Sequence, residues 1–472
     1  MIKSGEATDG ASSSWAPALI DGNAVIEPAK KLNICDEADV IVVGGGPGGV
    51  GAAVAASRCG ARTILIERYG CLGGMATGGL VTIFPNMADS DGNILIDGIC
   101  EESIQRLRNR NACYHPPRET WGSKDPDAVA YYKDASFFFD GGYYVNYGAH
   151  VDAEELKCVY DEMMEEENVK VYLHSWGAAA IVDSSGNNVK GVVFESKSGR
   201  QAILGKVVID CTGDGDLLPS AGAEFETFIP AGMRISAASH CFWIANVDLE
   251  RFKDWKSSAS GAEEYIAQAK ELMSLGGHPG QILSHMQNQE GLMWYHPRYE
   301  CLDQCDVESL TRVEIAGRKK MKTTLDYRRS HTPGFEKAYL VLSSPQLGTR
   351  CSRRVVGEYM LNQEDISAGM RHDDTIAMFP WTPSFRDYRG EALHIPYRCL
   401  IPRGVNGLLV ACRATSMDLH VSEYYNLIPH CIAFGQAAGT AAAQAADTGA
   451  DIREIDIRAL QNSLRNQGVV LP

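Results

Sequence analysis

The residues between Gly44 and Glu67 have the types and spacing needed to bind a dinucleotide. Gly44, Gly46 and Gly49 form a GxGxxG pattern, and Glu67 follows Gly49 by 18 residues. In such a pattern the first glycine permits a tight turn, the second admits a pyrophosphate, and the third lets a helix pack closely on a strand. The helix N-terminus offers free N–H groups to the phosphates. A carboxylate at the position of Glu67 suits a ribose without a 2′-phosphate.

A strand, a turn and a helix must hold these residues in place. Residues 39–43 form a β-branched apolar run, 48–59 are small residues typical of a packed helix, and 63–66 form a second apolar run. This order predicts a βαβ unit, in which the glycine pattern is a strong signal for a dinucleotide. The alternative is a structural glycine-rich turn with no ligand. The pattern alone does not separate NAD from FAD.

Three later stretches predict that the chain returns to the same ligand. Directly after Glu67, "RYGCLGGMATGG" keeps the backbone close to it. "VVIDCTGDGDLLPSAGA" places a strand before Gly213 and Asp214. "NGLLVACRATS" and "FGQAAGTAAAQAA" give a strand and a late helix, whose N-terminal N–H groups can stabilise negative charge on a reduced ring system.

These stretches resemble the FAD-dependent oxidoreductases of the glutathione-reductase-like, two-dinucleotide-fold group, which are loosely related to fumarate reductase flavoproteins. The similarity spans most of Glu37 to Ala446 and includes "GCLGGMATGGLV" and "IPHCIAFGQAAGTAAAQAA". It implies an α/β fold with a Rossmann-like FAD-binding domain and an inserted α+β substrate domain. The implied division is an N-terminal arm at 1–36, an FAD-binding domain at 37–100, 150–225 and 396–450, a substrate or cap domain at 101–149 and 226–395, and a C-terminal tail at 451–472.

The resemblance implies FAD as the cofactor and a set of residues around it. The pyrophosphate is expected beside the GxGxxG turn, the adenosine ribose beside Glu67, the adenine beside Ala178, and the ribityl chain and isoalloxazine beside residues 73–77. Residues 435–438 are expected at the pyrimidine edge of the flavin. The full set is Gly44, Gly46, Pro47, Gly48, Gly49, Glu67, Arg68, Gly73, Gly74, Met75, Ala76, Thr77, Ala178, Gly213, Asp214, Arg413, Gly435, Gln436, Ala437 and Ala438.

Candidate proton acceptors come from the segments expected near the flavin. They are His240, on an expected strand of the substrate domain, and His394, His420 and Tyr424, in the segment that re-enters the FAD domain. A neutral His or Tyr can accept a proton as hydride leaves for flavin N5. For each histidine the alternative is an ordinary core or surface role.

Arg350 is the remaining catalytic candidate. Together with Arg353 and Arg354 it is expected on a helix, where the three side chains can clamp a carboxylate or phosphate, or pair with acids such as Glu358. The resembled family often has Arg a few residues before the last helix, and this chain has Asn426 at that spacing.

Two further features have open interpretations. The aromatic stretch from Tyr131 to Tyr147 can line an apolar substrate cavity or form the core of the smaller domain. Cys71, near the expected flavin edge, can be a covalent attachment point, a redox thiol or a packing residue.

The expected function is hydride transfer between a small-molecule organic substrate and FAD. One dinucleotide motif is visible, so electrons are expected to pass to oxygen, a carrier protein or a transiently bound nicotinamide. The alternatives are a flavin monooxygenase or halogenase and a non-catalytic FAD-binding subunit.

Composition narrows the class of protein. The 472 residues are 45% hydrophobic and carry a net charge of -16, which disfavours nucleic acid as a partner. No apolar run reaches the length of a membrane span. The 14 cysteines have no repeated spacing, which favours reduced thiols in a cytoplasmic protein, and no metal site is expected. A homo-oligomer is compatible with this size and class.

Overall fold

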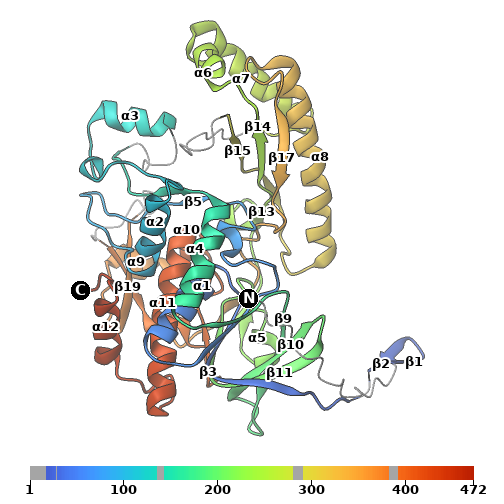
Figure 1. Ribbon diagram of the computed structural model, residues 1–472, viewed down its shortest axis with the longest axis vertical. Coiled ribbons are helices and arrows are strands. Elements are labelled where there is room, and N and C mark those ends of the chain that lie inside the picture. The colour runs from blue at the N-terminus through green and yellow to red at the C-terminus, as the bar shows by residue number, and fades with distance from the viewer. Residues whose placement is uncertain (1–17, 28, 136–142, 280–290, 382–391) are drawn as a thin grey trace, which may run out of the picture.

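The fold is built around one twisted sheet that draws its strands from three separated parts of the chain (Figure 1). The computed structural model describes residues 18–27, 29–135, 143–279, 291–381 and 392–472. The strand order is β8-β4-β3-β11-β10-β9, and β21 pairs with β11. Their bounds are β3 (Ile34–Val43), β4 (Thr63–Ile66), β8 (Lys170–Tyr172), β9 (Trp176–Val182), β10 (Val189–Ser196), β11 (Gly199–Asp210) and β21 (Leu408–Val410).

Most of this sheet is parallel. Pairs β3–β4, β4–β8, β3–β11 and β11–β21 are parallel, whereas β10 pairs antiparallel with β9 and β11. The continuous apolar runs of β3 and β4 are buried, as expected for strands covered on both faces. The predicted α/β class and the βαβ unit are therefore confirmed. The division into domains stays a prediction.

Two helices made of small residues pack on each other beside the sheet. They are α1 (Pro47–Arg58) and α11 (Ile428–Thr448). A Cβ atom at Gly435 would lie 1.9 Å from the Gly48 carbonyl oxygen, and one at Gly439 would lie 2.1 Å from the Ala52 carbonyl oxygen. Glycine is therefore required where the two backbones meet.

A second lobe lies at the far end of the molecule from α1 and α11 (Figure 1). It contains strands β13 (Ala237–Ser239), β14 (Phe242–Ala245), β15 (Met293–Tyr295), β16 (Arg298–Glu300) and β17 (Tyr339–Ser343). Its helices are α6 (Leu249–Ser257), α7 (Ala259–Ser274) and α8 (Val307–His331). Phe242, Tyr295 and Phe335 belong to its own apolar core.

Shorter elements complete the fold. The hairpin of β1 (Leu19–Asp21) and β2 (Ala24–Ile26) extends away from the sheet (Figure 1). The other strands and helices are β5 (Ile83–Phe84), β6 (Cys113–Tyr114), β7 (Ala149–Val151), β12 (Phe225–Glu226), β18 (Arg354–Val355), β19 (Thr375–Pro380), β20 (Ala392–Pro396), α2 (Ile99–Asn109), α3 (Pro126–Ala135), α4 (Ala153–Glu166), α5 (Leu218–Ala221), α9 (Gln363–Ala368), α10 (Leu419–Tyr424) and α12 (Ile457–Asn466). Within the described residues, no helix combines the length and the apolar character needed to cross a bilayer.

Two expectations about local structure are wrong. The end of the expected N-terminal arm at 1–36 is part of the central sheet, because β3 starts at Ile34 and pairs there with Ala202 of β11. The arginines from Arg350 to Arg354 do not form a helix. Arg354 lies in β18, where it pairs with Glu226 of β12 through an ion pair of 2.6 Å, and this cross-strand contact requires extended backbone.

Candidate functional site

The glycine turn between β3 and α1 has room for a ligand at one position. Gly44 has φ of 99°, and a Cβ atom there would lie 2.4 Å from the Cys211 carbonyl oxygen. A Cβ atom at Gly49 would lie 1.7 Å from the Gly44 carbonyl oxygen. By contrast, no heavy atom lies within 4 Å of a Cβ atom built on Gly46. Protein packing therefore requires glycine at Gly44 and Gly49, whereas Gly46 faces open space.

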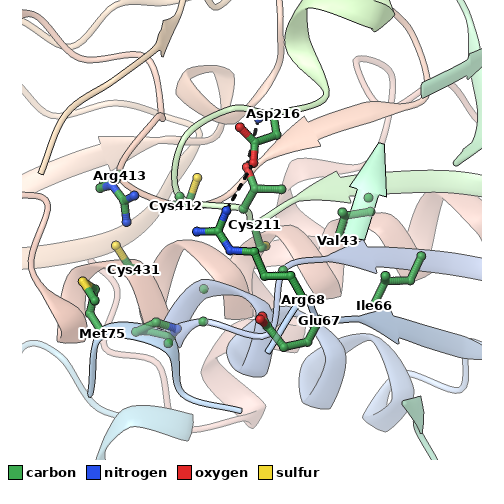
Figure 2. Close-up of a pocket in the computed structure, with 18 of the residues that line it drawn as sticks. Val43, Ile66, Glu67, Arg68, Met75, Cys211, Asp216, Cys412, Arg413 and Cys431 are labelled. Atoms are coloured by element: carbon green, nitrogen blue, oxygen red, sulfur yellow. Dashed lines mark hydrogen bonds and ion pairs between the residues drawn. The ribbon is translucent and has the colours of Figure 1, made fainter. Parts of the chain in front are cut away.

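That open space is a cavity at the carboxyl ends of the parallel strands, hereafter the cradle (Figure 2). Its wall includes Gly46, Glu67, Met75, Arg413 and Cys431. Parallel α/β sheets bind ligands at this edge, where strand ends and helix N-termini meet. The geometry therefore suits an extended ligand that passes the N-terminus of α1.

Glu67 is held rigidly on the wall of the cradle. Its carboxylate accepts hydrogen bonds from the backbone N–H groups of Gly45, at 2.5 Å, and Tyr69, at 2.7 Å. The residue is 5% exposed, and this burial raises the pKa of the carboxyl above its usual value. The two backbone bonds fix the direction of the carboxylate toward the cradle without help from another side chain.

A network of charged groups closes the opposite side of the cradle. Arg413 donates a hydrogen bond of 2.6 Å to Asp214, which also accepts one of 2.6 Å from Ser352. Burial raises the pKa of Asp214, but the Arg413 charge and the Ser352 hydroxyl outweigh it, so the pKa lies below its usual value. The Nε atom of Arg413 is buried and has no partner among the described residues. This N–H group is a free donor beside the cradle.

Asp216 provides a pH-dependent contribution to stability. Burial, followed by the charges of Asp214 and Asp210, raises the pKa of Asp216 to about 6. The native state therefore holds a proton that the unfolded chain has released, so the free energy of unfolding decreases as pH rises toward 6 and stays lower above it. We expect Asp216→Asn to raise the unfolding temperature at pH 7.5 and to change it less at pH 5. Thermal unfolding at both pH values measures the difference.

The exposed Asp447 gives a matched control for this variant. Asp447→Asn removes the same charge, and we expect the same small change in unfolding temperature at both pH values. An Asp216→Asn protein that unfolds at a lower temperature than the wild type at pH 7.5 would contradict the expectation.

A second cavity of about 220 Å³, hereafter the side cavity, adjoins the cradle. Four residues line both spaces: Pro47, Met75, Arg413 and Cys431. Val81, Ile83 and Trp294 give the side cavity an apolar wall, and Arg234, Arg298 and Arg350 contribute cations. A small molecule in the side cavity would therefore lie next to a ligand in the cradle.

Comparisons with known proteins agree with this geometry. The profile of the family described as FAD dependent oxidoreductase matches residues 39–464. The chain belongs to this family. The FAD-dependent oxidoreductase described here is also 56% identical over 39 residues to dihydrolipoyl dehydrogenase 1, mitochondrial, from Arabidopsis thaliana, a match that covers 8% of each chain.

Two solved structures align with the FAD-dependent oxidoreductase over most of its length. A geranylgeranyl bacteriochlorophyll reductase-like protein from Thermoplasma acidophilum is 14% identical, with coverage of 91% of this chain and 83% of that chain and a TM-score of 0.44. The p-nitrophenol 4-monooxygenase from Pseudomonas putida is 12% identical, with coverage of 92% and 85% and a TM-score of 0.43.

The residues of the cradle fit FAD. The open space at Gly46 gives a pyrophosphate access to the N-terminus of α1, and the unpaired Nε–H group of Arg413 offers a donor to the cofactor. The predicted residues that line the cradle are Gly44, Gly46, Pro47, Gly48, Glu67, Arg68, Gly74, Met75, Gly213 and Arg413.

Other predicted cofactor residues lie directly behind this wall. The Gly73 N–H group donates to the Gly45 carbonyl at 2.8 Å, and the Thr77 hydroxyl donates to the Leu72 carbonyl at 2.5 Å, so the segment that includes Ala76 is held against the turn. Ala178 lies on β9 beside Gly177, which lines the cradle. Gly49 and Asp214 support the wall through the contacts already described.

The expectation for residues 435–438 is corrected by the packing of α11. Gly435 touches α1, Ala437 and Ala438 are fully buried in the apolar core, and Gln436 accepts a hydrogen bond of 3.0 Å from the Ile99 N–H group. These residues position α1 rather than line the cradle. The part of α11 that lines both cavities is its first turn, at Cys431.

One of the five catalytic candidates, Arg350, lines the side cavity. His394 is buried in the hairpin of β19 and β20, and His240 is buried against Gly317 of α8. His420 and Tyr424 lie on α10 with ring centroids 6.1 Å apart. Of these described residues none but Arg350 is on the wall of either cavity, and the role of the other four as proton acceptors stays a prediction.

Sequence reasoning missed Arg234, Trp294, His296 and Arg298. The last three alternate in "WYHPR", a spacing typical of one strand face, although the structure divides this stretch between β15, a two-residue link and β16. Recognition of that alternation would have selected them. Arg234 carries no comparable local signal, because a turn brings it to the cavity.

Of the two open interpretations, the aromatic stretch shows packing at Tyr147, whereas Tyr131 and Tyr143 are exposed, and the role of Cys71 stays a prediction. Tyr147 is fully buried, stacks on Trp121 with centroids 3.8 Å apart, and donates a hydrogen bond to Glu101. Residues 136–142 of the aromatic stretch lie outside the described residues. Burial raises the pKa of the Cys71 thiol, which lowers its thiolate content, and Cys71 is not among the described residues that line the two cavities.

Proposed function

We propose that this FAD-dependent oxidoreductase transfers a hydride between FAD in the cradle and a small organic molecule in the side cavity. The observation that carries the proposal is the shared wall of Pro47, Met75, Arg413 and Cys431, which places the two compartments in contact. When bound, FAD supplies N5 as the hydride acceptor or donor. Adjacent binding of the two reactants is the main requirement for direct transfer between them.

The chain's residues support such a reaction in two ways. Met75, Val81 and Trp294 present apolar surface that keeps water from the substrate. Arg413, fixed by Asp214, holds a positive charge between the compartments, where it can stabilise negative charge that develops on either reactant.

The proposal includes an external electron partner. The sequence has one GxGxxG unit in a βαβ context, so electrons would leave or enter through oxygen, a carrier protein or a transiently bound nicotinamide.

Anaerobic reduction of the FAD-loaded protein tests the proposal. We expect at least one small alcohol, amine or hydroxy acid in a panel to bleach the visible flavin absorbance without oxygen, and the electron partner to restore it. A flavin that is reduced by NADH or NADPH alone, followed by oxygen-dependent formation of a hydroxylated or halogenated product, would instead identify a monooxygenase or halogenase.

A further inference from the structure

We infer that the substrate of the side cavity is a small organic anion, whose carboxylate is bound by Arg234, Arg298 and Arg350 while its apolar part contacts Trp294. This inference rests on the proposed function, because it names the class of molecule that would exchange hydride with FAD. The carriers of positive charge come from three separate elements: a helical turn before β13, the start of β16 and the loop after β17.

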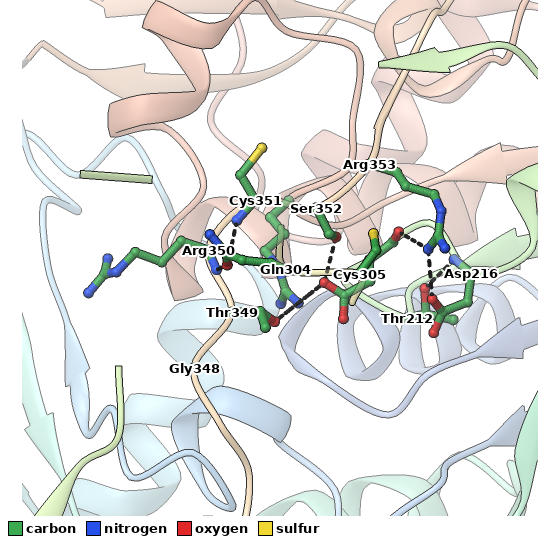
Figure 3. Close-up of polar contacts among 12 residues, drawn as sticks. Thr212, Asp216, Gln304, Cys305, Gly348, Thr349, Arg350, Cys351, Ser352 and Arg353 are labelled. Carbon is green, nitrogen blue, oxygen red and sulfur yellow. Dashed lines mark hydrogen bonds and ion pairs between the residues drawn. The ribbon is translucent and has the colours of Figure 1, made fainter. Parts of the chain in front are cut away.

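The three guanidinium groups lack anionic partners in the protein. In the described parts of the chain no carboxylate lies within 4.0 Å of their nitrogen atoms, whereas neighbouring Arg353 pairs with Asp216 at 3.2 Å. Figure 3 shows Arg353 directed to Asp216 and Arg350 directed away from that network. The cations of the side cavity are therefore available to a ligand.

The nearest acid serves a different purpose. Both carboxylate oxygens of Glu423 accept hydrogen bonds from backbone N–H groups, those of Arg234 and Ile235. Its carboxylate thereby fixes the backbone that carries Arg234 and leaves the guanidinium free of an ion pair.

Neutral groups hold the arginine side chains in place. Arg350 donates a hydrogen bond of 3.1 Å to Nε2 of His296, and Arg234 donates one of 2.8 Å to Oδ1 of Asn426. Asn426 in turn donates to the Arg350 carbonyl oxygen at 3.2 Å. Partners without charge orient the guanidinium groups but do not neutralise them, which is the arrangement expected of a preorganised anion site.

The free-energy cost of holding these unpaired cations together indicates what the cavity binds. Burial and the neighbouring charges of Arg234 and Arg298 lower the pKa of Arg350 to about 9, and burial lowers that of Arg234 to about 10. The Nε atom of Arg350 is also buried without an acceptor among the described residues. Unpaired like charges and an unmet donor destabilise the empty cavity, and a bound carboxylate would satisfy both.

The composition of the walls defines the rest of the ligand. Opposite the cations, Val81, Ile83 and Ile428 provide aliphatic surface, and the volume of about 220 Å³ limits the molecule to a small metabolite. Asn426, which stands where the resembled family often has Arg, contributes orientation here, while the charge comes from other elements.

Equilibrium binding to the oxidised, FAD-loaded protein tests the inference without turnover. Benzoate and benzamide have the same shape and differ in charge, so their dissociation constants, measured by flavin absorbance and calorimetry, report recognition of the anion. We expect benzoate to bind at least about tenfold more tightly, because a hydrogen bond between charged groups is stronger than one to a neutral amide. Acetate and succinate extend the series if the aromatic ring does not fit.

Variants distinguish the effect of the local site on benzoate binding from the effect of the protein's overall charge. We expect Arg350→Met and Arg298→Met each to weaken benzoate binding about tenfold with FAD content unchanged. Arg318→Met removes an exposed cation from α8 and should bind benzoate as the wild type does.

Equal binding of benzoate and benzamide, no carboxylate bound at millimolar concentration, or unchanged binding by both cavity variants would overturn the inference. If phenyl phosphate binds more tightly than benzoate, the inferred carboxylate ligand is wrong and a phosphate ester takes its place. Failure of the proposed function would give a different result. In that case carboxylates would bind, but no substrate would bleach the flavin.

Discussion

Replacement of Gly46 by valine is expected to abolish FAD binding while the protein remains folded. Gly46 has extended backbone, with φ of -69° and ψ of -172°, and no protein atom lies within 4 Å of an added Cβ atom. A side chain there meets only the space that the pyrophosphate requires. We expect FAD affinity to fall at least about 100-fold, or about 2.7 kcal/mol, as measured by titration of the apoprotein with FAD.

The smaller variant Gly46→Ala provides the matched control, with a weaker loss of affinity expected. Both variants should unfold in urea within about 1 kcal/mol of the wild-type apoprotein, because an N-cap substitution has an effect of that order. A valine variant that retains wild-type FAD affinity would show that the pyrophosphate does not approach this glycine.

Replacement of Gly435 by alanine is expected to destabilise the apoprotein strongly. The added methyl group would lie 1.9 Å from the Gly48 carbonyl oxygen, and a backbone atom of a packed helix cannot move aside as a flexible side chain can. Overpacking of this kind costs about 1–3 kcal/mol or more. We expect a lower midpoint of urea unfolding with an unchanged slope.

Gly435→Ala and Gly46→Ala add the same methyl group in opposite surroundings, the first in a tight helix contact and the second in open space. We expect the first to reduce stability before FAD is added and the second to reduce FAD affinity with little change in stability. An unchanged unfolding midpoint for Gly435→Ala would mean that α1 and α11 can separate at no cost.

Local sequence signals predicted the nucleotide half of the fold well. The runs at 39–43 and 63–66 became β3 and β4, and the small-residue stretches became α1 and α11, because apolar periodicity and glycine spacing report directly on strand and helix packing. Gly46 and Glu67, expected from the glycine pattern, and Arg413, implied by the family resemblance, all line the cradle.

The side cavity could not be predicted in this way. Its cations come from Arg234, Arg298 and Arg350, which lie far apart in the sequence and meet only after the second lobe folds. His240 and His394 were predicted as site residues because histidine often transfers protons. In the structure both are buried in other contacts and do not lie on the cavity wall. The glycines of α11 allow close packing on α1. Sequence alone does not distinguish this role from contact with a cofactor.

The contact between α1 and α11 also has a consequence for biosynthesis. Residues near the two ends of the described chain meet there, and β21, which flanks β11, also comes from the late part. A growing polypeptide therefore leaves the ribosome with the small-residue face of α1 uncovered until α11 has emerged. Such distant pairing slows folding and exposes intermediates to aggregation. Cofactor capture is thus expected only after α11 has been synthesised, and chaperones that shield α1 would raise the yield of flavin-loaded protein.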